Sequence, residues 1–92
     1  MRIERGVGAP VEIAISDGSS AQSTLLTPGE YIITTNLDVA FVVGEDPTAT
    51  SSSRKLWAYT YRYLTIDGAT SMKVAAVRLV SSTGTVSIER LS

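Results

Sequence analysis

Apolar and polar residues alternate with a period of two in each of the longer segments of this chain. In the segment VEIAIS, residues 11–16, the valine and both isoleucines fall on one face of an extended backbone. No segment has the i, i+3, i+4, i+7 spacing of an amphipathic helix. Gly, Pro, Asp and Ser stand between the alternating segments, where they favour turns. The pattern therefore predicts an all-β chain.

We expect seven to eight short strands, with antiparallel pairing. The expected strands cover residues 11–16, 21–27, 30–35, 39–44, 55–66, 72–80 and 85–92. Short strands at regular intervals are typical of an antiparallel sandwich or barrel. We predict a β-sandwich of the jelly-roll or Greek-key kind. The serine-rich stretch at 45–54 is expected to be a loop and the most mobile part of the chain.

The length of 92 residues predicts one domain, which we place at residues 11–92. Residues 1–10 are a separate segment. Gly6, Gly8 and Pro10 argue against a central strand there. We therefore expect residues 1–10 to form an N-terminal arm or an edge strand.

The composition limits the classes of partner. The chain has no cysteine, and its 8 basic and 9 acidic residues leave a net charge of −1. Its 12 Ser and 11 Thr give a charge-poor surface, which tolerates close packing against copies of itself. We expect no nucleic acid partner because no basic patch is present. We expect no membrane contact because no apolar run approaches about 18 residues. The N-terminus lacks the pattern of a signal peptide, so synthesis in a cytoplasm is expected.

The sequence offers little to catalysis. It contains no histidine and no cysteine, which removes the usual general base, the soft metal ligands and the Ser-His and Cys-His pairs. The Gly6-Val7-Gly8 stretch neither follows a strand nor opens a helix, so it is no phosphate loop. Asp17, Asp38 and Asp67 stand in turns, where aspartate bonds its own backbone. We expect no enzyme, no cofactor and no metal site.

Aromatic residues are concentrated in KLWAYTYRYLTI, residues 55–66, where Trp57, Tyr59, Tyr61 and Tyr63 occupy alternate positions. In one unbroken strand all four would point to the same side. They could fill the core, although buried tyrosine hydroxyls need partners. They could equally form a protein interface, or a platform on which sugar rings stack. A bulge near Ala58 would divide them between the two faces.

Two stretches carry a resemblance to a known class of protein. They are PGEYIITTNLDVAFVVGEDPTA, residues 28–49, and AAVRLVSSTGTVSIERL, residues 75–91. Together with the polar loop between them, they resemble the small all-β virion proteins of tailed bacteriophages. These are the capsid decoration or cement proteins and their jelly-roll relatives. The resemblance lies in the layout of strands and turns and in no catalytic or ligand motif.

The resemblance implies a structural protein of the virion, made in the host cytoplasm and located on the capsid surface. Such proteins are commonly trimers that bind the major capsid protein and stabilise the assembled head. An N-terminal arm carrying Arg2, Glu4 and Arg5 would suit contact with a neighbour. With these three, the candidate subunit or capsid interface comprises Trp57, Tyr59, Tyr61 and Tyr63. The alternatives are a phage tail or fibre component, or a small glycan-binding module. A small hydrolase is a further hypothesis, but no carboxylate pair stands out for it.

Overall fold

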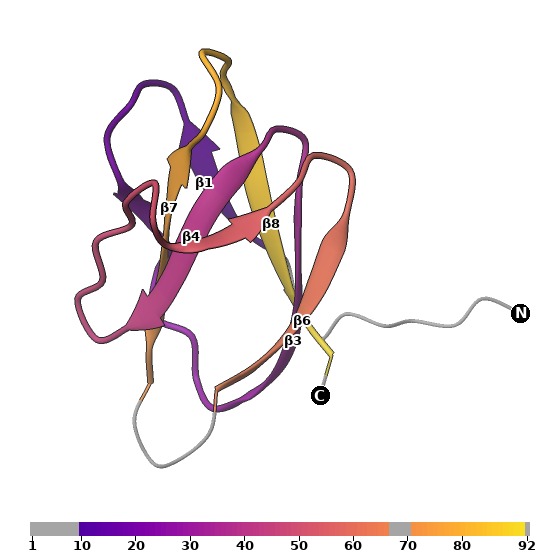
Figure 1. Cartoon of the computed structure of the whole chain (residues 1–92). Coiled ribbons are helices and arrows are strands. Elements are labelled where there is room, and N and C mark those ends of the chain that lie inside the picture. The colour runs from indigo at the N-terminus through magenta and orange to yellow at the C-terminus, as the bar shows by residue number, and fades with distance from the viewer. Residues whose placement is uncertain (1–9, 67–70, 92) are drawn as a thin grey trace, which may run out of the picture.

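The computed structural model describes residues 10–66 and 71–91. These residues form eight antiparallel strands in two four-stranded sheets, packed as a sandwich and without a helix among them (Figure 1). The strands are β1 (Val11–Ile15), β2 (Ala21–Gln22), β3 (Gly29–Thr35), β4 (Val39–Gly44), β5 (Arg54–Leu56), β6 (Tyr61–Ile66), β7 (Lys73–Arg78) and β8 (Gly84–Arg90). The predicted fold class is confirmed. Residues 1–9 lie outside the described residues, so the arm or edge strand there stays a prediction.

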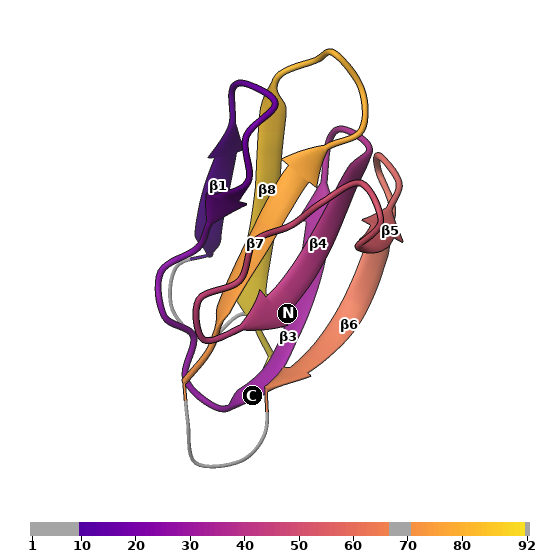
Figure 2. The ribbon, with the colours of Figure 1, turned by 60° about the vertical axis from the view of Figure 1, so that its left-hand side comes forward.

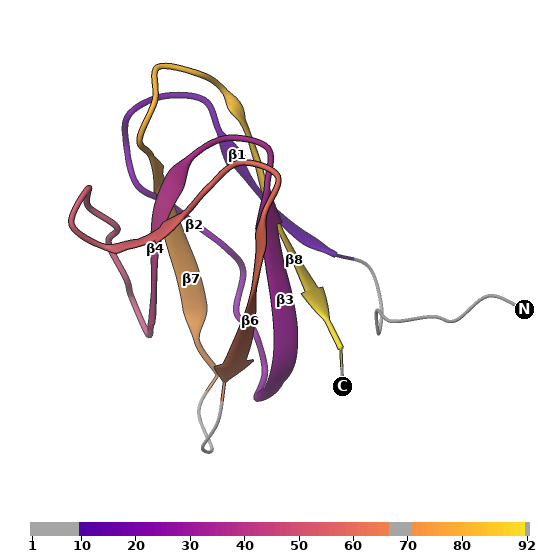
Figure 3. The ribbon, with the colours of Figure 1, turned by 45° about the vertical axis from the view of Figure 1, so that its right-hand side comes forward.

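The strands pair in a nested order. β1 pairs with β8, β2 with β7, β3 with β6, and β4 with β5. The pairs β3–β8 and β4–β7 then join these hairpin-like units into sheets of order β1-β8-β3-β6 and β2-β7-β4-β5. This is the strand order of a jelly roll, in which the chain is a long ladder folded over on itself. Figure 3 shows the two sheets as separate layers, with β3, β6 and β8 in one and β4 and β7 in the other.

The inner faces of both sheets meet in one apolar core. Its largest fully buried side chains come from four strands: Ile33, Val39, Val74, Val86 and Ile88. Their alternation with outward residues is the period-two pattern of the sequence. Tyr31 is the buried tyrosine of this core, and its hydroxyl donates to the carbonyl of Thr27 at 2.5 Å. The Arg90 guanidinium lies 5.6 Å from the centre of the Tyr31 ring, a cation–π contact.

The predicted strand at 21–27 is shorter in the structure. Its ladder with β7 covers only Ala21–Gln22, followed by an isolated bridge between Leu26 and Met72. Ser23 explains the early end. Its Oγ accepts the N–H of Val74 at 2.9 Å, in the place of a backbone carbonyl. A side chain thus takes over the ladder bond, which is how serine competes with regular strand pairing.

A loop covers the outer face of the β2-β7-β4-β5 sheet. Ala40 and Ala75 point away from the core, yet both are 0% exposed. The chain between β4 and β5 crosses β7 and β4 on this side, with Pro47 and Ala49 buried (Figure 2). Three hydrogen bonds hold it there. Gln22 Nε2 donates to the Pro47 carbonyl at 2.7 Å and to Asp46 Oδ1 at 2.9 Å, and the Ala49 N–H donates to Ser20 Oγ at 2.9 Å. The expected loop at 45–54 is therefore packed against the sheet, and β5 begins at Arg54.

Gly84 offers a test of the packing between the start of β8 and the connection from β3 to β4. A Cβ there would lie 2.3 Å from Asn36 Oδ1 and 2.7 Å from Leu37 Cδ2. Gly84→Ala should lower the free energy of unfolding by about 1–3 kcal/mol, because Asn36 must give up its 2.9 Å bond to the Thr85 N–H. Urea unfolding measures the change. Gly18→Ala is the control, with nothing within 4 Å of the added methyl, and should change stability by less than about 0.5 kcal/mol. Equal effects of both changes would contradict the packing.

Candidate binding face

The aromatic segment is not one strand. β5 ends at Leu56, a turn covers Trp57 to Thr60, and β6 begins at Tyr61 in the other sheet. The expectation of an unbroken strand over 55–66 is wrong, and the break near Ala58 is a full turn rather than a bulge. Residues of the β3–β4 region cause it. The Ala58 N–H donates to Asp38 Oδ1 at 2.7 Å, and the Tyr59 N–H donates to the Thr35 carbonyl at 2.8 Å.

Tyr59 holds an unusual backbone conformation at the tip of this turn. Its φ is 62°, and it has the one positive φ among the described residues that are not glycine. The Thr60 N–H donates back to the Trp57 carbonyl at 3.2 Å, which closes the turn. A positive φ at the third residue of such a turn favours glycine, because a side chain there is strained by about 1–3 kcal/mol. The chain nevertheless carries a large aromatic residue at this position, and its ring projects into solvent.

All four aromatic residues are exposed. The exposed fractions are 55% for Trp57, 86% for Tyr59, 60% for Tyr61 and 66% for Tyr63. The interpretation that they fill the core is therefore wrong. Only Tyr61 and Tyr63 share a strand face, and their rings pack edge to face with centroids 5.4 Å apart. The two interpretations that place the rings on a surface, for protein or for sugar, remain.

The outer face of the β1-β8-β3-β6 sheet has no covering loop among the described residues. We name it the open face. It comprises Glu12 and Ala14 of β1, Thr85, Ser87 and Glu89 of β8, Glu30, Ile32 and Thr34 of β3, and Tyr61, Tyr63 and Thr65 of β6. All of them are exposed or half-buried, in contrast to Ala40 and Ala75 of the other sheet.

The strand register arranges the open face in rows. One row runs Glu12, Ser87, Thr34 and Tyr61 across the four strands. In the next row Glu89 lies opposite Ile32, which lies opposite Tyr63. The face thus has Glu12 and Glu89 toward β1 and β8, Glu30 on β3 and the aromatic rings on β6. It holds three glutamates and neither lysine nor arginine, so its charge is negative.

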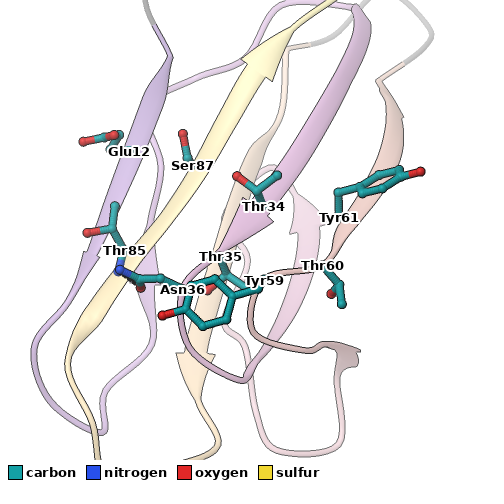
Figure 4. A pocket seen from close by; sticks show the side chains of 9 residues that line it. All are labelled: Glu12, Thr34, Thr35, Asn36, Tyr59, Thr60, Tyr61, Thr85 and Ser87. Atoms are coloured by element: carbon teal, nitrogen blue, oxygen red, sulfur yellow. Dashed lines mark hydrogen bonds between the residues drawn. The ribbon is translucent and has the colours of Figure 1, made fainter.

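A shallow hollow of about 440 Å³ lies at one end of the open face, beside the 57–60 turn. Tyr59, Thr60 and Tyr61 bound one side, and Glu12, Thr34, Thr35, Asn36, Thr85 and Ser87 complete the lining. Figure 4 shows Glu12, Ser87 and Thr34 on neighbouring strands, with Tyr59, Thr60 and Tyr61 on the other side of the hollow. Glu12 is the charged residue of this lining, and most of the others offer hydroxyl groups. The hollow can therefore accept hydrogen-bonding or cationic groups, and it disfavours anions.

The sequence analysis named Tyr59 and Tyr61 of this hollow and missed its polar lining. Glu12, Thr34, Thr85 and Ser87 lie at outward positions of their strands, which the period-two pattern makes visible. Their adjacency depends on the order β1-β8-β3, which alternation does not reveal. Asn36 is placed by its bond to Thr85, between segments 49 residues apart. Arg2, Glu4 and Arg5 lie outside the described residues, so their part in an interface stays a prediction.

The described residues contain no group of three or more Asp or Glu side chains placed to hold a metal ion. The search for a helix long and apolar enough to cross a membrane also found none in this part of the chain. No protein-family model, no curated protein and no solved structure matches the chain.

The positive φ of Tyr59 predicts a difference in stability between two substitutions at this residue. The free energy of unfolding of the Tyr59→Gly variant should be about 1 kcal/mol higher than that of the Tyr59→Ala variant, because glycine adopts a positive φ without steric cost. Both variants lose the same ring, so the difference isolates the backbone. Chemical denaturation of the two variants in parallel measures it. A Tyr59→Ala variant as stable as Tyr59→Gly would show that the turn is not strained.

Proposed function

We propose that the protein is a non-enzymatic structural protein of a bacteriophage virion. In this proposal it decorates or cements the capsid, binding the major capsid protein as a trimer and stabilising the assembled head. The observation that carries the proposal is the contrast between the two sheets. One outer face is partly covered by the chain's own loop, while the other presents exposed tyrosines and three glutamates. A sheet face left open in this way is available to a partner.

The chemistry of the open face suits a protein partner. Tyr and Trp are enriched at interfaces, because each ring offers a large contact area together with one polar group. Tyr61 and Tyr63 lie on a sheet, so their backbone positions are fixed before binding, which lowers the entropic cost of association. A decoration protein repeats such contacts over many positions on a shell, and avidity then turns modest contacts into stable attachment.

A second candidate function is a small glycan-binding module, as a separate protein or as a tail or fibre component. The hollow beside Tyr59 favours it, because an aromatic ring and several hydroxyl-bearing side chains converge on a space of about 440 Å³. Sugar rings stack on aromatic faces and exchange hydrogen bonds with hydroxyl, amide and carboxylate groups.

Head binding tests the first proposal through the open face. The double variant Tyr61→Ser, Tyr63→Ser should bind phage heads that lack the protein at least about 30-fold more weakly than wild type, a loss of about 2 kcal/mol. Co-sedimentation with such heads measures the affinity. Leu25→Ser is the matched control, since Leu25 is 60% exposed and lies away from the open face. If the double variant binds heads as wild type does but no longer binds neutral sugars on a glycan array, the glycan-binding module is favoured.

The predicted arm has its own test in the same assay. Removal of residues 1–10 should abolish head binding while the midpoint of unfolding stays close to that of wild type. The expectation follows because β1 begins at Val11 and the core residues of the described chain all lie in or after β1. Circular dichroism verifies that the shortened chain folds. Head binding that survives the truncation would count against the arm.

A further inference from the structure

Three of the six basic residues in the described part of the chain lie together at one edge of the sandwich. Arg54, Lys55 and Arg62 lie where β5 of one sheet meets β6 of the other, and we name them the basic edge. The Arg62 Nη2 atom donates to the Lys55 carbonyl at 3.4 Å, which places its guanidinium across β5. The Arg54 and Arg62 side chains are both exposed. The basic edge therefore presents two arginines to solvent beside the tyrosines of β6.

The opposite side of the open face carries the complementary charge. Glu12 lies on β1 and Glu89 on β8, at the far end of the order β1-β8-β3-β6. β1 and β6 are separated by three strand spacings, about 14 Å. Within one molecule Arg62 is therefore too far from Glu12 for an ion pair. The two groups can meet only between molecules.

The hydrogen bonds of the basic residues leave their charges unneutralised. Lys55 Nζ donates to the carbonyls of Ser51 and Ser53, and Arg78 donates to that of Ser82. Arg90 donates to Thr27 Oγ1, to the Tyr31 hydroxyl and to the Pro28 carbonyl. Each of these acceptors is neutral, as is the carbonyl that Arg62 reaches. Arg62 at the basic edge and Glu12 on β1 thus carry opposite charges on opposite sides of one molecule.

We propose that the Glu12 and Glu89 side of the open face is covered by a second copy of this chain. The basic edge of one copy packs on this side of the next, and Tyr61 and Tyr63 on β6 stay available for head binding. The hollow beside Glu12, about 440 Å³ in volume, receives an arginine of the neighbour's basic edge. This inference rests on the proposed function, which requires a trimer, and it names the contact. Two different patches meet, so the contact is head to tail, and it closes into a ring when the rotation allows.

Association by side chains fits the edge better than addition of a strand. β6 is an edge strand, and such strands pair with other chains unless something blocks them. Arg62 faces the core side of β6 and yet is exposed, because β5 opposite it has only three residues. An inward charge at a sheet edge discourages strand addition. The same arginine remains free to meet a carboxylate of a neighbouring copy.

A charge exchange tests the contact. Arg62→Glu and Glu12→Arg should each weaken self-association at least about tenfold, because each places like charges together. The double variant carrying both changes should return to within about threefold of wild type. Light scattering after size exclusion measures the mass, from about 10 µM to about 1 mM protein. Raising NaCl from about 50 mM to about 500 mM should weaken the wild-type oligomer.

Matched controls alter the net charge by the same amounts elsewhere. Lys73→Glu lies on the other sheet and Glu45→Arg in the covering loop, and neither should change the oligomer. A wild-type monomer at every concentration would overturn the inference, as would a double variant that fails to recover. Sensitivity of the oligomer to the control changes would overturn it as well.

The head-binding assay separates this inference from the proposed function. A monomer that still binds heads removes the inference and the trimer, and it leaves the decoration of the head standing. An oligomer that recovers in the double variant but never binds heads retains the inference and removes the proposed function. Binding of neutral glycans by a monomer removes the inference and favours the second candidate.

Discussion

Backbone hydrogen bonds between β3 and its two neighbours, β6 and β8, determine which side chains share the open face. The register places Thr34 of β3 between Ser87 of β8 and Tyr61 of β6, so residues far apart in the sequence meet in one row. Without disulfides, and with no helix in the described segments, strand pairing is where the backbone groups of this chain find partners. A shift of one residue in either ladder would turn Tyr61 and Tyr63 toward the core.

Local patterns predicted most of the strands because each strand has one buried face. Val39 and Phe41 are buried and alternate with outward residues, as the sequence pattern of β4 indicated. Ala40 exposed the limit of that reasoning. It points outward, yet it is 0% exposed, because the chain at 45–53 crosses this side of the sheet. Burial of this kind comes from a segment distant in the sequence, so periodicity within β4 does not reveal it.

The aromatic segment shows why the candidate site was only partly predictable. Its alternation continues from Trp57 to Tyr63 without a proline or glycine, so the sequence has no local sign of a turn. The turn forms because Asp38 and Thr35 bind the N–H groups of Ala58 and Tyr59. Those partners lie about 20 residues earlier in the chain, so the decisive interaction is tertiary. The hollow has the same origin, since its lining comes from four segments that only the fold brings together.

The charge pattern connects the edge of the sandwich with its open face. A covered face, such as that beneath Pro47 and Ala49, shields a sheet without an external partner. Within residues 10–66 and 71–91 no segment shields the open face in this way, and two of its rows run from glutamate on β1 or β8 to tyrosine on β6. In the proposed assembly, the arginines next to those tyrosines meet the glutamates of the following copy. Because Arg62 also discourages strand addition at β6, the association proceeds through side chains in a fixed orientation. A contact of that kind is head to tail, and it closes into a ring when the rotation between copies allows.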